Sequence, residues 1–196
     1  MNLRSAIDLL AMLACSVYCT IPLFWLALHP FIARWRQRGR RAYGLILPTW
    51  AVFIAAAFLI VWAFRFVRYY ATWLGWIPAA FLFWIGLSLY RAGFKSFSRT
   101  QVSGLAELEP GAHRQELVTT GIRARVRHPI YLGHLCEIAA WCVGTGLVAL
   151  FALAGFAMIT GALMIRIEER ELEARFGEEY RAYRRTVPAV IPRFGS

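Results

Sequence analysis

Two short charged blocks hold the residues whose types and spacing suit chemistry. The first block, LVTTGIRARVRHPIYLG (117–133), places Arg127 and His128 directly before Pro129. Proline restricts the preceding residue to extended conformations and is favoured at the first position of a helix. His128 is therefore predicted to precede a helix N-terminus. The free backbone amides and the helix dipole favour an anion there. This position suits a carboxylate of a ligand. The alternative is a juxtamembrane anchor that contacts lipid head groups.

The second block, RIEERELEARFGEEYRAYRR (166–185), begins where a long apolar run ends. Its adjacent Glu168 and Glu169 suit a ligand with a sulfonium, an ammonium or ribose hydroxyls, and either one could act as a general base. The alternative is a solvated helix face whose carboxylates pair with neighbouring arginines. Apolar positions recur at helical spacing, which predicts one amphipathic helix over this block; they are Leu172, Phe176, Tyr180 and Tyr183.

His134 and Glu137 lie inside the apolar run that separates the two blocks, three residues apart and so on one helical face. Ionisable groups within a membrane segment are rare and usually face a cavity or a partner. We therefore expect His134 and Glu137 to border a substrate pocket. A structural His–Glu pair near the interface is the competing interpretation.

The composition is that of a membrane protein. Hydrophobic residues make up 59% and charged residues 17% of the 196, whereas a soluble domain has about 45–50% and about 25%. The net charge of +11 comes from arginines in loops between apolar runs, which favours an anionic lipid surface and no nucleic-acid partner. Four cysteines without CxxC spacing predict neither a metal site nor a disulfide framework.

Apolar runs predict an all-α, polytopic membrane fold. Residues 6–28, 45–64 and 74–90 each approach the ~20 residues that a spanning helix needs. The run 130–165 is too long for a single crossing, and Gly144 and Gly146 near its midpoint predict a tight helical hairpin. The expected fold has about five transmembrane helices, the last two forming this hairpin, followed by an amphipathic cytosolic helix.

The basic loops predict the topology. The arginine-rich loop 34–41 and the polar segment 91–127 fall on the same side, which should be cytoplasmic. The site and the C-terminus then face the cytoplasm, in a plasma or inner membrane. One integrated domain is expected, with three helices in residues 1–90 and the functional core in residues 91–196.

The two blocks together resemble the isoprenylcysteine carboxyl methyltransferase family, and the related phospholipid methyltransferases share the pattern. The resemblance covers residues 116–192 and rests on RHPxYxG followed by EE…FGxEYxxYxxxVPxxIP. It implies an integral-membrane methyltransferase that uses S-adenosylmethionine and has no Rossmann fold. The family often has an aromatic residue soon after the first glycine, whereas Ile122 and Arg123 follow Gly121 here.

The resemblance also implies roles for individual residues. The cofactor would lie between the two blocks, in contact with Leu117, Val118, Thr119, Gly121, His128, Pro129, Tyr131, Glu168 and Glu169. Arg127 and one of the two glutamates would orient the acceptor.

The acceptor stays open between two chemistries. A carboxylate, such as that of an isoprenylcysteine, is already nucleophilic and needs a cation to aim it, whereas a phospholipid amine needs a base. The expected partners are a lipophilic or prenylated substrate and membrane lipids, and the oligomeric state is left open. The rival interpretations are a membrane reductase similar to sterol reductases, which bind NADPH, and a non-catalytic membrane scaffold.

Overall fold

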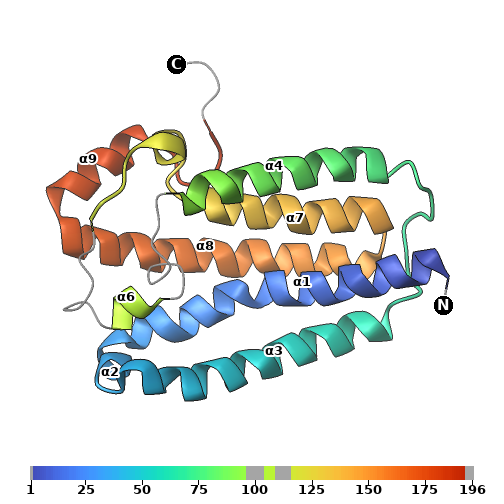
Figure 1. The fold of residues 1–196 in the computed structure, drawn as a ribbon, viewed down its shortest axis with the longest axis horizontal. Helices are drawn as coiled ribbons and strands as arrows, with labels where there is room; N and C mark the ends of the chain where they lie inside the picture. The colour runs from blue at the N-terminus through green and yellow to red at the C-terminus, as the bar shows by residue number, and fades with distance from the viewer. Residues whose placement is uncertain (1, 96–103, 109–115, 193–196) are drawn as a thin grey trace.

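Long helices lie side by side in the computed structural model, which describes residues 2–95, 104–108 and 116–192 (Figure 1). They are α1 (Leu3–Leu28), α3 (Tyr43–Ala63), α4 (Trp76–Phe94), α7 (Pro129–Thr145) and α8 (Val148–Phe176). The shorter helices are α2 (Ile32–Arg36), α6 (Leu105–Leu108) and α9 (Glu178–Thr186), with 3-10 turns at His29–Phe31, Gly39–Ala42 and Gly121–Ala124. The predicted all-α fold is confirmed for the described residues.

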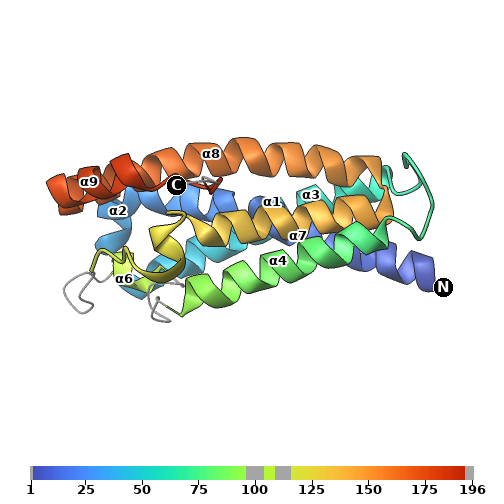
Figure 2. The same ribbon diagram turned by 90° about the horizontal axis from the view of Figure 1, so that it is seen from above.

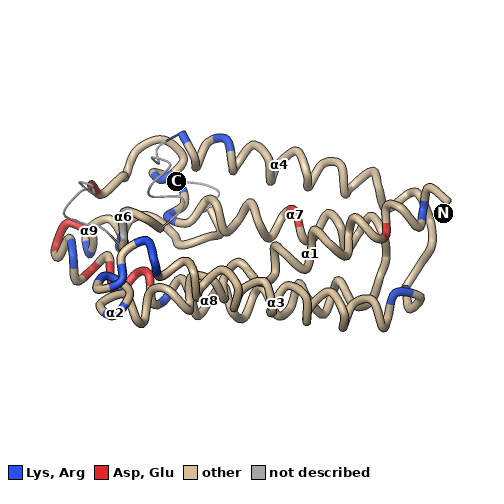
Figure 3. Tube along the Cα trace, turned by 60° about the horizontal axis from the view of Figure 1, so that its bottom comes forward, with Lys and Arg blue, Asp and Glu red and all other residues tan. Residues whose placement is uncertain are grey.

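Successive long helices alternate in direction, so one end of the bundle collects parts that are distant in the sequence. The ends of α1, α4 and α8 lie there with the beginnings of α3 and α7, beside α2, α6 and α9 (Figure 1). Figure 2 shows α7 between α4 and α8. Most charged residues gather at this same end, and fewer lie at the end that carries the N-terminus (Figure 3).

Four segments within the described residues are long and apolar enough to cross a membrane: Leu3–Arg36, Gly39–Ala63, Trp76–Phe94 and Val148–Phe176. Their outer faces expose large apolar side chains to the surroundings, as lipid-facing helices do; Leu59, Ile77 and Trp84 are 64%, 72% and 65% exposed. The chain is a multi-pass integral membrane protein. The predicted fifth span corresponds to α7, which has 17 residues and is not among the four segments.

Helices α4 and α7 pack closely because small residues face each other across their contact. A Cβ added at Gly86 would lie 3.0 Å from Glu137 Oε1 and 3.1 Å from the carbonyl oxygen of Gly133. Ala79, Gly86 and Gly93 recur every seven residues on the buried face of α4. Small residues allow this close approach in a bilayer, where packing drives helix association. The contact fixes the beginning of α7 against the end of α4.

The hairpin turn lies where the sequence predicts it. Helix α7 ends at Thr145, Gly146 adopts φ = 70°, and α8 begins at Val148. The amide of Tyr69 donates to the carbonyl of Gly146 (2.9 Å), and the amide of Val148 donates to the carbonyl of Val67 (3.1 Å). These bonds tie the turn to the loop between α3 and α4, at the end of the bundle remote from α9.

The charged block differs from the single amphipathic helix that the spacing predicts. Its first part is a continuation of α8, which runs unbroken from the apolar residues 148–165 to Phe176. At ~1.5 Å per residue, 29 residues span roughly 44 Å, so the charged end extends beyond a hydrocarbon core of about 30 Å. Gly177 (φ = 56°) interrupts the helix because L-residues rarely adopt this conformation, and α9 begins at Glu178.

The main core lies where α1, α3, α7 and α8 meet. Cys15, Cys19 and Cys142 are buried there as free thiols beside Ile138 and Leu150. Their role in the described structure is that of small apolar residues.

Candidate active site

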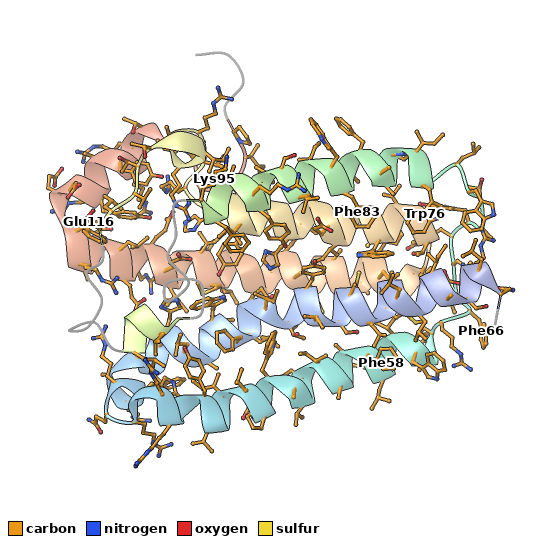
Figure 4. All side chains as sticks on the ribbon, viewed as in Figure 1. Phe58, Phe66, Trp76, Phe83, Lys95 and Glu116 are labelled. Carbon is orange, nitrogen blue, oxygen red and sulfur yellow. The ribbon has the colours of Figure 1, made fainter. Side chains whose placement is uncertain are left out.

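A cavity of about 350 Å³ lies at the end of the bundle that carries α2, α6 and α9. Its walls come from α1, α4, α7, α8, α9 and the loop that precedes α7. Glu116 on this wall lies beside α8 and α9, whereas Phe66 marks the opposite end of the bundle (Figure 4). Eight predicted site residues line the cavity: Leu117, Val118, Arg127, His128, Pro129, Tyr131, His134 and Glu168.

The backbone around His128 is held by the segment that follows α9. The amide of Arg127 donates to the carbonyl of Pro188 and the amide of His128 to that of Ala189, each at 2.9 Å. The Tyr183 hydroxyl donates to the carbonyl of Arg123 (2.6 Å). The two sequence blocks therefore form one unit, in which the RHP loop (127–129) is bonded to the VPAVIP segment (187–192).

The guanidinium of Arg127 is fully engaged by protein groups. Its Nε donates to Glu169 Oε1 (2.9 Å), another of its nitrogens also contacts this carboxylate, and a third donates to the carbonyls of Val187 and Arg184. Both side chains of the ion pair are buried, at 7% and 9% exposure. In this geometry Arg127 links the loop before α7 to α8 and to the segment after α9. Its predicted role in aiming the acceptor stays a prediction.

His128 is buried between the two glutamates. Its Nδ1 lies 3.6 Å from Glu168 Oε2, and its Nε2 lies 3.4 Å from Glu169 Oε1. The ring is thereby oriented by α8, and Pro129 begins α7 immediately after it, as predicted. The structure thus brings together the residues that the sequence places in two separate blocks.

Two oxygens on the cavity wall are buried without a hydrogen-bond partner among the described residues, Glu168 Oε2 and the Tyr180 hydroxyl. Buried polar atoms in native proteins nearly always have a hydrogen-bond partner. A buried polar atom on a cavity wall that has none can therefore form a hydrogen bond with a ligand. A carboxylate oxygen fits the ribose hydroxyls or the ammonium group of S-adenosylmethionine, and the neighbouring Leu117, Val118 and Tyr131 offer apolar surface for its adenine. Burial, followed by the nearby Glu169 carboxylate, raises the pKa of Tyr180, which stays a neutral donor.

The described lining of the cavity does not include the other four predicted residues. Glu169 lies behind the wall in its ion pair with Arg127. Thr119 is half-buried, and Gly121 borders a separate groove beside Arg91 and Lys95.

Glu137 lies deeper, on the buried face of α7 against α4. Its predicted contact with substrate stays a prediction.

The N-terminal helix supplies a wall that the sequence does not predict. Ile21, Trp25 and His29 line the cavity, and the Trp25 and His29 rings stack at 5.4 Å. His29 Nδ1 pairs with the carboxylate of Glu171 on α8. The sequence does not predict this contact, because no local pattern links Trp25 to residues more than 140 positions away.

Further lining residues come from α4, from the 3-10 turn before α7, and from α8 and α9. They are Phe94, Arg123, Met164, Leu172, Arg175, Phe176, Tyr180 and Tyr183. Four of them form the apolar stripe that recurs at helical spacing in the sequence, namely Leu172, Phe176, Tyr180 and Tyr183. That spacing was the signal that could have identified them as one common face of α8 and α9.

Arg123 stands where the resembling family often has an aromatic residue. It is 6% exposed and donates to the carbonyl of Gly93 (3.2 Å), and burial lowers its pKa.

The fold is that of an integral-membrane protein, and its ligand-sized cavity, lined by carboxylate and imidazole groups at one end of the bundle, is the candidate site. The sequence model of the phospholipid methyltransferase family matches residues 71–179, more than half of the chain. The chain belongs to this family of membrane methyltransferases, which use S-adenosylmethionine. The predicted superfamily and cofactor are thus confirmed.

Three named relatives show the range of the likeness. Methanethiol S-methyltransferase 2 of Bradyrhizobium diazoefficiens is 35% identical over 150 residues, 74% of this chain and 50% of that protein. Methanethiol S-methyltransferase of Mycobacterium tuberculosis is 31% identical over 116 residues, 57% and 47% of the two chains. Protein-S-isoprenylcysteine O-methyltransferase of Schizosaccharomyces pombe is 37% identical over 83 residues, 39% and 33%. The chain spans about half the length of the first two relatives. No solved structure matches it.

Proposed function

We propose that this protein transfers the methyl group of S-adenosylmethionine to a small apolar thiol. The observation that carries the proposal is that two buried oxygens, Glu168 Oε2 and the Tyr180 hydroxyl, have no hydrogen-bond partner in the described structure and lie on a cavity bordered by the RHP loop. The names of the B. diazoefficiens and M. tuberculosis relatives support a thiol acceptor. The cofactor supplies an electrophilic methyl group, and the protein positions it and excludes water.

The cavity wall divides into a polar and an apolar part that suit the two reactants. His128, Pro129 and Glu168 lie at the polar end and would hold the cofactor, together with the apolar Leu117 and Val118. Ile21, Trp25 and Met164 line the same cavity, come from membrane helices and would contact the acceptor. An apolar thiol can enter from the bilayer, while the water-soluble cofactor enters from the aqueous side.

The carboxylate of an isoprenylcysteine is the second candidate acceptor, supported by the S. pombe relative. A carboxylate needs a cation to aim it, and Arg127 is already engaged by Glu169 and backbone carbonyls. Arg123 and Arg175 also border the cavity and are the cations that this candidate would use. The family name suggests a phospholipid amine as a third candidate acceptor. The family assignment also argues against a nicotinamide-dependent reductase.

The finer topology is part of the proposal. Since α7 lies between α4 and α8 and runs alongside the membrane helix α4, we infer that it crosses the membrane as a fifth helix. Because arginine is concentrated around α2 and α9, we infer that this end, with the site and the C-terminus, faces the cytoplasm of a plasma or inner membrane. Residues 91–196 then hold most of the cofactor site, and residues 1–90 add the wall from α1.

Methyl transfer from labelled S-adenosylmethionine tests the proposal. Purified protein is assayed in proteoliposomes with an alkyl thiol, an isoprenylcysteine analogue and phosphatidylethanolamine. Thiol methylation is expected. Transfer to none of the three acceptors would refute the proposed function and would favour a non-catalytic scaffold.

The Glu168→Gln variant tests the cofactor position. Loss of a hydrogen bond to a charged group costs about 1.5–3 kcal/mol, which corresponds to a roughly 10- to 150-fold weaker affinity for S-adenosylmethionine. The matched control is Glu179→Gln, an exposed glutamate of α9 that does not line the cavity. Equal affinities in the two variants would contradict this position.

A further inference from the structure

The imidazole of His134 forms part of the cavity wall, which has both polar and apolar lining residues. It lies five residues after Pro129, in the second turn of α7, and shares the wall with Ile21 and Met164. None of the contacts that hold the RHP loop together involves this side chain. It is a nucleophilic and basic group that the arrangement of the cofactor pocket does not use.

A hydrogen bond fixes which nitrogen of His134 is basic. Its Nδ1 lies 2.8 Å from the carbonyl oxygen of Ile130. A carbonyl oxygen only accepts hydrogen bonds, so Nδ1 carries the proton and the lone pair of the neutral ring is at Nε2. Within the described residues, Nε2 has no hydrogen-bond partner. The ring therefore offers a base to the cavity.

Aromatic rings from three directions hold the imidazole in this orientation. Tyr18 of α1 lies at 5.6 Å between centroids, Tyr90 of α4 at 5.1 Å and Tyr131 of α7 at 6.3 Å. Two carboxyl groups lie on the elements around it: Glu137, about one turn further along α7, and Glu168 of α8, which lines the same cavity. The Tyr90 hydroxyl is buried without a partner in the described structure.

A thiol acceptor needs such a base. The nucleophile is the thiolate, and a free thiol has a pKa of about 8.5, so most of it is protonated at neutral pH. Entry into a largely apolar cavity disfavours the thiolate further. His128 is less suited to take the proton, because both of its ring nitrogens face Glu168 and Glu169.

We propose that Nε2 of His134 deprotonates the thiol acceptor, an inference that rests on the proposed function. The S–H bond breaks, its proton forms the N–H bond at Nε2, and its electron pair stays on sulfur. That pair forms the new S–CH₃ bond, while the electrons of the broken methyl–sulfonium bond stay with the departing thioether. The imidazolium then releases its proton to water at the polar end of the cavity.

The test is a series of acceptors that differ in acidity, from aryl thiols ionised at the assay pH to alkyl thiols that are largely protonated. His134→Asn keeps an N–H near the position of Nδ1 for the Ile130 carbonyl but has no basic nitrogen. A general base contributes about 10²- to 10⁴-fold, so kcat should fall by this factor for alkyl thiols. For ionised aryl thiols it should change only a few-fold, and the affinity for S-adenosylmethionine should be unchanged.

Met164→Leu is the matched control, because it alters the same wall without changing a titratable group. It should shift all acceptors alike. Equal losses across the series in His134→Asn, or no loss, would overturn the inference while leaving thiol methylation by the wild type intact. Failure of the wild type with every thiol would refute the proposed function itself. His134→Gln serves as the second variant if His134→Asn does not fold.

Discussion

Replacing Arg127 by methionine tests the contact that joins the two halves of the site. The change removes the hydrogen bonds to Glu169 and to the carbonyl of Val187, and it leaves the Glu169 carboxylate buried. The apolar methionine has a similar reach, so the change concerns charge and hydrogen bonding more than volume.

The expected cost follows from the partners that remain. Removing one member of a buried ion pair costs about 3–5 kcal/mol. Glu169 would keep weaker contacts to Arg184 Nε at 3.5 Å and to His128 Nε2 at 3.4 Å. We therefore expect a loss near the lower end, about 3 kcal/mol in the free energy of unfolding. Affinity for S-adenosylmethionine should fall as well, because the RHP loop loses part of its support.

Equilibrium unfolding in mixed micelles with increasing dodecyl sulfate measures this loss. Arg181→Met is the matched control, since Arg181 pairs with Glu178 (2.8 Å) and Glu173 (3.4 Å) on the exposed face of the same region. Exposed pairs contribute little to stability, so this variant should unfold with the wild type. An Arg127→Met curve that coincides with that of Arg181→Met would refute the assignment of Arg127 as the link between the blocks.

Two further predictions concern the turn and the topology. Gly146→Ala should destabilise the protein by more than about 1 kcal/mol, because φ is 70° and the new Cβ would lie 2.4 Å from the carbonyl oxygen of Tyr70. Gly155→Ala, whose Cβ would meet nothing within 4 Å, should leave the thermal unfolding midpoint unchanged or higher; equal effects of both would contradict the turn geometry. A reporter fused after Ser196 should be active in the cytoplasm, and activity on the other side would refute the proposed orientation.

The sequence predicts the hairpin because its cause is local. A 36-residue apolar run cannot cross a bilayer once, and Gly146 provides the left-handed conformation that the turn requires. The bounds of α1, α3 and α4 are likewise close to their predicted values, since hydropathy marks them, whereas α8 continues beyond the apolar run to Phe176. The break at Gly177 was missed, because one glycine inside a charged amphipathic pattern is compatible with a continuous helix.

The candidate site was predictable only in its two contiguous blocks. Their residues are close in sequence, and the hairpin returns the second block beside the first. The wall formed by Trp25 and His29 depends instead on the packing of α1 against α8, which no periodicity encodes. The engagement of Arg127 by backbone carbonyls near residue 187 is also a tertiary contact. A basic residue in a loop does not reveal whether its partner will be a ligand or the protein itself.

The pairing of the RHP loop with the carbonyls of Pro188 and Ala189 has a consequence for biosynthesis. Residues 188 and 189 leave the ribosome after every long helix has been made, and the loop has no such partners before then. A nascent chain can insert all of its helices while its cofactor site is still unassembled. A chain that terminates before residue 188 lacks both backbone partners of the loop, so synthesis of the last few residues completes the site.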